Sequence, residues 1–214
     1  MSITDYLLQN LKGPITLYVS DYSFGLVPKT LKFKDIRPRL SHIDGNRHAH
    51  LPEVAHVLAT RGRPLSSFKV IFAAIRNPYD LEVSHFHRMK SRTELGLPGK
   101  SKARQIVAGG DFELFAEEAP YYGFLPSNIE RYYSIDGETP PNMRLIRFEN
   151  LNDEVERLIE PHSYGRAQMG HRNKSERNSD FRTYFTPRSE QAIYAKYRFL
   201  FDFYDREKIS PDTR

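Results

Sequence analysis

The residues best suited to chemistry surround the sequence RNPYD at 76–80, whose arginine is followed eight residues later by Ser84. The apolar run 70–75 shows no polar alternation and predicts a strand buried on both faces, as in a parallel sheet. The Asn-Pro pair predicts a turn, after which Asp80 is placed to cap the helix that carries Ser84. Arg76 is therefore expected at the carboxyl end of a core strand, where open α/β sheets bind their ligands. An arginine, a serine hydroxyl and a helix amino end together predict a phosphate site; the alternative is an arginine paired with a nearby carboxylate.

Three segments of the chain, taken in order, resemble the sulfotransferases that use PAPS (3'-phosphoadenosine 5'-phosphosulfate). RNPYD at 76–80, with the serine that lies four residues after its aspartate, is similar to their 3'-phosphate-binding motif. MRLIRFENL at 143–151 is similar to a late strand-and-turn block of the carbohydrate-type and bacterial members. The C-terminal block of the family is resembled by NKS at 173–175, FRTYFTP at 181–187 and the tyrosine-rich stretch 197–204.

This resemblance implies a PAPS cofactor, the product PAP, and a 3'-phosphate held by Arg76 and Ser84. It also implies that a loop closes over the 3'-phosphate, using Arg172, Asn173, Lys174 and Ser175. The alternative for this loop is a solvated surface turn. Glu149, in the second block, is expected to be structural and to fix a turn through backbone amides.

Sulfuryl transfer is expected to follow phosphoryl transfer, with in-line attack by an acceptor oxygen, cations at the leaving phosphate and a base for the acceptor hydroxyl. The candidate bases are His48 and His50, because imidazole has an ordinary pKa of about 6.5 and accepts a proton at neutral pH. Both resemble the catalytic histidine pair of glycan 2-O-sulfotransferases. The alternative is a histidine that caps or packs at a loop-to-helix junction. Glu53 is a further candidate, although a glutamate in a first helical turn more often stabilises the helix.

The family follows its first strand with a glycine-rich loop, whose amides and lysine cradle the 5'-phosphosulfate. Here VPKT at 27–30 begins in the same way but continues without the glycines. We assign the leaving-phosphate cation to Lys29, with Lys32 as a substitute, and add Thr30 to the cofactor contacts. A rival placement puts this loop at 20–25, without a lysine. Bulky residues where glycines normally allow close approach make this 5' site degenerate.

The patterns around these residues alternate between strands and helices. Strands are predicted at 15–20, 70–75 and 144–148, and irregular segments at 21–47 and 91–110. The predicted helices span 2–11, 51–60, about 80–90, 112–119, 127–135, 153–159 and 189–205, the last capped by Thr186 or Ser189. This alternation predicts a three-layer α/β fold with a mostly parallel central sheet flanked by helices, in one domain spanning 1–214. The resemblance implies the P-loop-like sulfotransferase version of this fold.

The composition narrows the function classes. The chain has 32 Lys and Arg against 27 Asp and Glu, a net charge of +5, and no cysteine. The mild basicity suits anionic ligands such as nucleotides, while disulfides, thiolate metal sites and cysteine nucleophiles are excluded. No run reaches transmembrane length, and a cytoplasmic protein is expected.

The prediction is a sulfotransferase acting on a hydroxyl of a carbohydrate or glycolipid acceptor. The alternative is a non-catalytic relative that binds PAP, another nucleotide or a sulfated glycan. A P-loop kinase is disfavoured because no Walker-type loop occurs. A nucleic-acid partner is not expected, since the basic residues are dispersed.

Overall fold

The computed structural model describes residues 3–22, 37–46, 48–94, 102–120, 129–165 and 180–204. The chain is an α/β protein that divides into two compact units. The first unit contains Met1–Ala73, Tyr132–Ile146 and Asn150–Lys174, and the second contains Ala74–Arg131, Arg147–Glu149 and Ser175–Arg214. The expectation of one domain over 1–214 stays a prediction.

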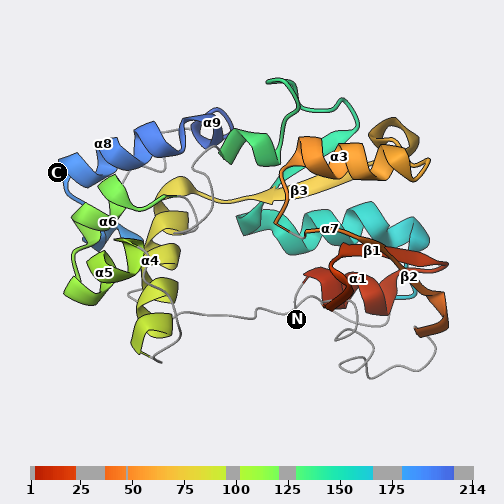
Figure 1. Cartoon of the computed structure of the whole chain (residues 1–214), viewed down its shortest axis with the longest axis horizontal. Helices are drawn as coiled ribbons and strands as arrows, with labels where there is room; N and C mark the ends of the chain where they lie inside the picture. Colours follow the sequence, from red (N-terminus) through yellow and green to blue (C-terminus); the bar gives the residue numbers. More distant parts are fainter. Residues whose placement is uncertain are drawn as a thin grey trace. The chain divides into compact units, whose positions relative to one another are not determined.

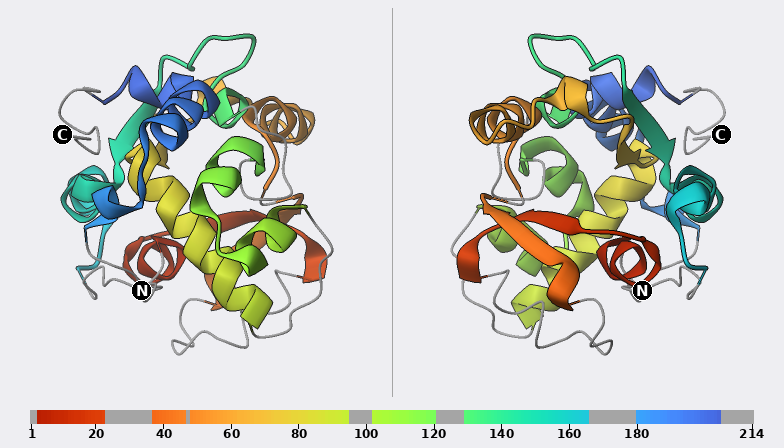
Figure 2. Two further views of the ribbon diagram at one scale, coloured as in Figure 1. Left: turned by 90° about the vertical axis from the view of Figure 1, so that its left-hand side faces the viewer. Right: turned by 90° about the vertical axis from the view of Figure 1, so that its right-hand side faces the viewer.

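The first unit contains a two-stranded parallel sheet (Figure 2). Strand β1 (Ile15–Val19) pairs with β2 (Leu40–Asp44), in a register that places Thr16 opposite Ser41. These two side chains share a hydrogen bond of 2.9 Å between their hydroxyl oxygens. Among the described residues of this unit, helices are formed by α1 (Ile3–Asn10), α3 (Leu51–Thr60) and α7 (Leu151–Ile159).

The second unit is mainly helical (Figure 1). Helix α4 contacts α5, α6 and α8, and an aromatic cluster around Phe86, Phe112 and Phe115 lies among them with edge-to-face ring contacts. Such pairs add about 0.5–1.5 kcal/mol beyond the burial of their area. The helices are α4 (Pro78–Glu94), α5 (Lys102–Gly109), α6 (Phe112–Glu118), α8 (Pro187–Lys196) and α9 (Arg198–Phe201).

A second parallel pair of strands, β3 (Ile71–Ile75) and β4 (Met143–Arg147), runs from the first unit into the second. The predicted strand at 70–75 is therefore present, but the expectation that it is buried on both faces is wrong. Only Ile75 is buried, and the other residues of β3 are half-buried. A single central sheet in three layers is not confirmed, because the described strands form two separate pairs.

Several predicted elements differ from the observed ones. Helix α5 lies in the stretch 91–110 that was expected to be irregular, and β2 lies in the irregular stretch 21–47. In the described part of 127–135, the predicted helix is only a 3-10 turn at Ile129–Tyr132. The predicted long last helix ends at Lys196 and resumes at Arg198 as α9.

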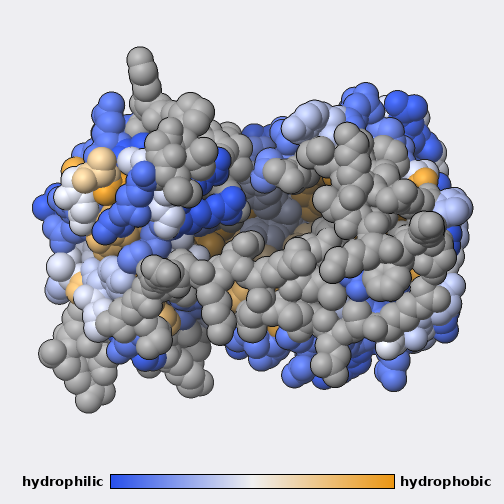
Figure 3. Space-filling view, turned by 90° about the horizontal axis from the view of Figure 1, so that it is seen from below, coloured by the Kyte–Doolittle hydropathy of each residue, from blue (hydrophilic) through white to orange (hydrophobic). Residues whose placement is uncertain are grey.

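The described surface is mainly hydrophilic in the view of Figure 3. The large hydrophobic side chains that are exposed among the described residues are Tyr22, Phe68, Phe148 and Tyr164. No helix in the described ranges is both long enough and apolar enough to cross a membrane. Of the four exposed side chains, Phe148 lies beside a predicted site residue.

Candidate functional site

The structure brings Arg76 and Ser84 together in the second unit. Arg76 follows the last residue of β3, and its Nη1 donates a 3.2 Å hydrogen bond to the Oγ of Ser84 in the second turn of α4. Because this hydroxyl oxygen accepts from Arg76, its own proton can be donated to a further acceptor. The pair therefore offers N–H and O–H donors from one place, which is the donor set that a phosphate oxygen requires.

Arg76 also has the carboxylate partner that the alternative interpretation expected. Its Nε lies 2.5 Å from Oδ2 of Asp80, and the two side chains are 22% and 18% exposed. Asp80 and Ser84 follow Arg76 by four and eight residues, so both lie on the face of α4 along which the guanidinium extends. The carboxylate fixes the orientation of the guanidinium, and it also contributes a negative charge that a bound anion has to share.

The ring of Phe148 covers the guanidinium of Arg76. Its centroid lies 4.8 Å from the Cζ atom of Arg76, a cation–π distance. An aromatic ring in this place keeps water from part of the cation, which strengthens its interactions with anions. No role was predicted for Phe148 from the sequence, although this residue stands inside the block at 143–151.

The amino end of α4 is arranged differently from the prediction. The helix begins at Pro78, and Oδ1 of Asn77 accepts a 3.0 Å hydrogen bond from the backbone N–H of Tyr79. Asn77 is therefore the cap, and the expectation that Asp80 caps the helix is wrong. Proline has no N–H and a fixed φ that suits a first helical position, so the helix begins at Pro78 and not after Asp80. Asp80 is left to pair with Arg76.

Glu149 has the structural role that was expected of it. Its Oε1 accepts a long hydrogen bond of 3.4 Å from the backbone N–H of Asn77, in the turn between β3 and α4. Its Oε2 accepts a 2.9 Å hydrogen bond from the hydroxyl of Tyr204. The carboxylate thus holds the turn that carries Arg76.

The candidate bases His48 and His50 belong to the first unit and differ in environment. His48 is exposed in a turn, where its backbone N–H donates to Oδ1 of Asn46. His50 is 7% exposed, precedes the first residue of α3, and packs its ring 4.6 Å from the ring of Tyr132. Within the described part of the chain, the buried Nε2 of His50 has no hydrogen-bond partner.

Glu53 lies directly beside His50. Its Oε2 accepts a 3.3 Å hydrogen bond from the backbone N–H of His50, and its Oε1 lies 3.6 Å from the imidazole Nδ1. The imidazole of His50 therefore stands next to a carboxylate at the amino end of α3. His50 therefore fits both interpretations. It lies at the loop-to-helix junction, as a capping or packing histidine would, and its imidazole stands next to a carboxylate, as a base would.

The other predicted site residues lie outside the described residues. These are Lys29, Thr30, Lys32, Arg172, Asn173, Lys174 and Ser175.

A buried polar cluster behind Arg76 was not predicted. Glu82 on α4 is 1% exposed and accepts hydrogen bonds from Lys196 Nζ, at 2.6 Å, and from the hydroxyl of Tyr197. Burial raises the pKa of the Glu82 carboxyl, against the opposing influence of Lys196. One turn along α4, burial lowers the pKa of His85 to about 3, helped by the charges of Arg88, Arg76 and Lys196. His85 is therefore neutral at neutral pH.

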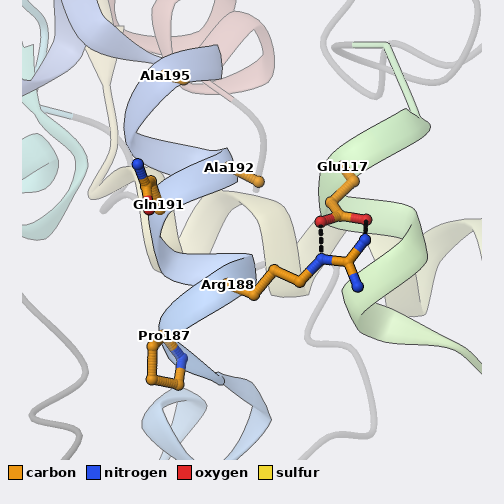
Figure 4. A pocket seen from close by; sticks show the side chains of 6 residues that line it. All are labelled: Glu117, Pro187, Arg188, Gln191, Ala192 and Ala195. Carbon is orange, nitrogen blue, oxygen red and sulfur yellow. Dashed lines mark hydrogen bonds and ion pairs between the residues drawn. The ribbon is translucent and has the colours of Figure 1, made fainter.

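A pocket of about 420 Å³ lies between α6 and α8 (Figure 4). Arg188 crosses it and forms two parallel hydrogen bonds with the carboxylate of Glu117, one of them 2.8 Å from Nη2 to Oε2. None of the described candidate residues lines this pocket, whose walls are Glu117, Pro187, Arg188, Gln191, Ala192 and Ala195.

Comparison with known proteins adds no relative, since no family model, curated protein or solved structure matches this chain.

Proposed function

We propose that the chain is a PAPS-dependent sulfotransferase, which moves a sulfuryl group from PAPS to a hydroxyl of a carbohydrate or glycolipid acceptor. The observation that supports this most is the pairing of Arg76 with Ser84, at 3.2 Å, directly after β3. The sequence motif at 76–84 required these two side chains to converge, and the cation and hydroxyl together suit a phosphomonoester. We include in this proposal the three-layer P-loop-like sulfotransferase fold, which has a mostly parallel central sheet.

In this proposal the 3'-phosphate of the cofactor binds Arg76 and Ser84. Lys29 and Thr30 contact the 5'-phosphosulfate, and Arg172, Asn173, Lys174 and Ser175 close over the 3'-phosphate. The leaving group is the 5'-phosphate of PAP, and its developing negative charge is stabilised by the Lys29 cation.

The base of the proposed reaction is His50. Its buried Nε2 is unsatisfied within the described residues, and Glu53 lies 3.6 Å from its Nδ1. A buried nitrogen normally has a hydrogen-bond partner, so an acceptor hydroxyl at this position would satisfy it. His50 would take the proton of that hydroxyl as the oxygen attacks sulfur and the bond from sulfur to the leaving phosphate oxygen breaks.

Calorimetric titration with PAP and with 5'-AMP tests the cofactor assignment, because the two ligands differ in the 3'-phosphate. We expect the wild-type chain to prefer PAP, and Arg76→Ala to weaken PAP binding by about 10- to 100-fold, the equivalent of a charged hydrogen bond. Arg76→Lys keeps the charge but removes the guanidinium fork, so it should recover only part of the loss. Lys90→Ala, an exposed cation on the same helix, is the matched control. Unchanged PAP affinity in Arg76→Ala would show that the phosphate binds elsewhere.

The second candidate is a non-catalytic protein that binds PAP, another nucleotide or a sulfated glycan. The absence of glycines after VPKT at 27–30 favours it, because bulky residues there obstruct a 5'-phosphosulfate. Incubation with sulfur-labelled PAPS and a panel of carbohydrate acceptors separates the two candidates. Label transfer supports the enzyme, whereas PAP binding without any transfer supports the second candidate.

A further inference from the structure

The segment 147–149 contacts two parts of the second unit. These are the turn that carries Arg76 and the residues Phe203 and Tyr204 after α9. Arg147 donates a 2.6 Å hydrogen bond from Nη2 to the backbone oxygen of Phe203. Its guanidinium also lies 5.0 Å from the ring centroid of Tyr204. All these residues belong to the second unit, so the contacts lie within one compact body.

The centre of this arrangement is the hydroxyl of Tyr204. It donates a 2.9 Å hydrogen bond to Oε2 of Glu149 and lies 3.4 Å from the backbone oxygen of Ile75, the residue before Arg76. The other oxygen of Glu149 accepts from the N–H of Asn77, the residue after Arg76. Tyr204 therefore contacts the backbone on one side of Arg76 directly and on the other side through Glu149.

We propose that Tyr204 is a positioning residue for Arg76 and Ser84, here called the phosphate clamp. In this role it sets the preference for 3'-phosphorylated nucleotides over nucleotides with a free 3'-hydroxyl. This inference rests on the proposed function. Tyr204 does not touch the phosphate; it acts by fixing the backbone on both sides of Arg76. Because a rigid clamp loses less conformational freedom on binding, its affinity for the 3'-phosphate is higher.

The environment of Tyr204 suits this role. The side chain is 7% exposed, so its hydrogen bonds do not compete with bulk water. Burial, together with the charge of Glu149, raises the pKa of the Tyr204 hydroxyl well above its ordinary value. The hydroxyl therefore remains a donor throughout the physiological range. Its partner, a carboxylate oxygen, makes the stronger class of hydrogen bond.

The test compares the affinities for PAP and 5'-AMP by calorimetry in the full chain. Tyr204→Phe removes only the hydroxyl, and Glu149→Gln replaces one of the two acceptor oxygens without changing the size of the side chain. The matched control is Tyr184→Phe in the same unit, because the described contacts of Tyr184 with His87 and Phe112 are made through the ring. Far-ultraviolet circular dichroism checks that each variant is folded. If Tyr204→Phe is unfolded, the comparison is made with Glu149→Gln alone.

We expect the ratio of the AMP dissociation constant to the PAP dissociation constant to fall about tenfold in Tyr204→Phe, while AMP affinity changes less than twofold. The double variant should lose no more than the larger single loss, since both residues act along one path. A merely structural role would weaken both ligands equally. An unchanged ratio in folded Tyr204→Phe and Glu149→Gln, with a wild-type chain that prefers PAP, overturns this inference alone. A wild-type chain without any PAP preference overturns the proposed function and this inference with it.

Discussion

At the scale of single residues, the two candidate histidines differ in ways that the sequence HAH at 48–50 does not reveal. His50 is buried beside Glu53, whereas His48 is exposed. We expect His50→Asn to lower the turnover of PAPS by about 100- to 10,000-fold, the usual contribution of a positioned base. Asparagine is chosen because it still caps α3, so the helix start is retained. His48→Asn is the control and should leave turnover within about twofold.

The measurement is single-turnover transfer of labelled sulfate, with PAP affinity determined in parallel. His50→Asn should bind PAP as the wild type does, because the imidazole is assigned to the acceptor and not to the cofactor. Full turnover in His50→Asn would exclude this residue as the base. Loss in His48→Asn instead would move that role to the exposed histidine.

The residue scale also shows how much of the candidate site follows from the sequence. The approach of Arg76 to Ser84 is predictable, because a strand end followed by a helix places residues eight apart on one side. The contact from Tyr204 to Ile75 joins residues that are 129 positions apart, and no local pattern contains it. The pairing of Asp80 with Arg76 was foreseen only as a generic alternative, because Asp80 was expected to cap α4 in place of Asn77.

At the scale of elements, helices with clear start signals in the sequence are predicted well, and elements that depend on tertiary contacts are not. Helix α3 has the expected bounds, since its apolar spacing is accompanied by a proline in the first turn and by Glu53. Strand β2 was missed because its sequence, LSHID, has little strand character, and its pairing with β1 depends on tertiary contact. Helix α5 was missed although its buried residues Ala103, Ile106 and Val107 have helical spacing, because basic residues and glycines surround them.

The packing of α4 on α8 provides an element-scale prediction, because Glu82 and Lys196 form a buried pair between them. Lys196→Met should lower the free energy of unfolding by about 3–5 kcal/mol, because it leaves the Glu82 carboxylate buried without its cation. Adding Glu82→Gln should recover much of this loss, since the charge is removed and Tyr197 keeps an acceptor. Urea denaturation followed by circular dichroism measures both variants. A double variant as unstable as Lys196→Met would show that the pair acts through packing and not through charge.

At the scale of the whole molecule, we expect the free energy of unfolding to depend on pH because of His85. Its pKa is about 3 in the folded protein because the ring is buried and faces the cations Arg88, Arg76 and Lys196. The ordinary value is 6.5. Between these two values the unfolded chain binds a proton that the folded chain does not. The free energy of unfolding therefore rises with pH across this window and reaches its full value above about pH 6.5.

The contribution of His85 is isolated by comparing slopes. Within the window it should be about 1.4 kcal/mol per pH unit, and His85→Gln should remove it, even if the variant is less stable at neutral pH. Glu82, with its raised pKa, acts in the opposite sense but is present in both proteins and cancels in the comparison. The control is His56→Gln, at an exposed histidine of α3. Urea unfolding at about pH 4.5, 5.5 and 6.5, between the folded and the ordinary pKa of His85, gives the slope of the free energy of unfolding for each protein. Equal slopes for wild type and His85→Gln would mean that the buried ring does not remain neutral in acid, and that the packing around α4 relaxes before the histidine is protonated.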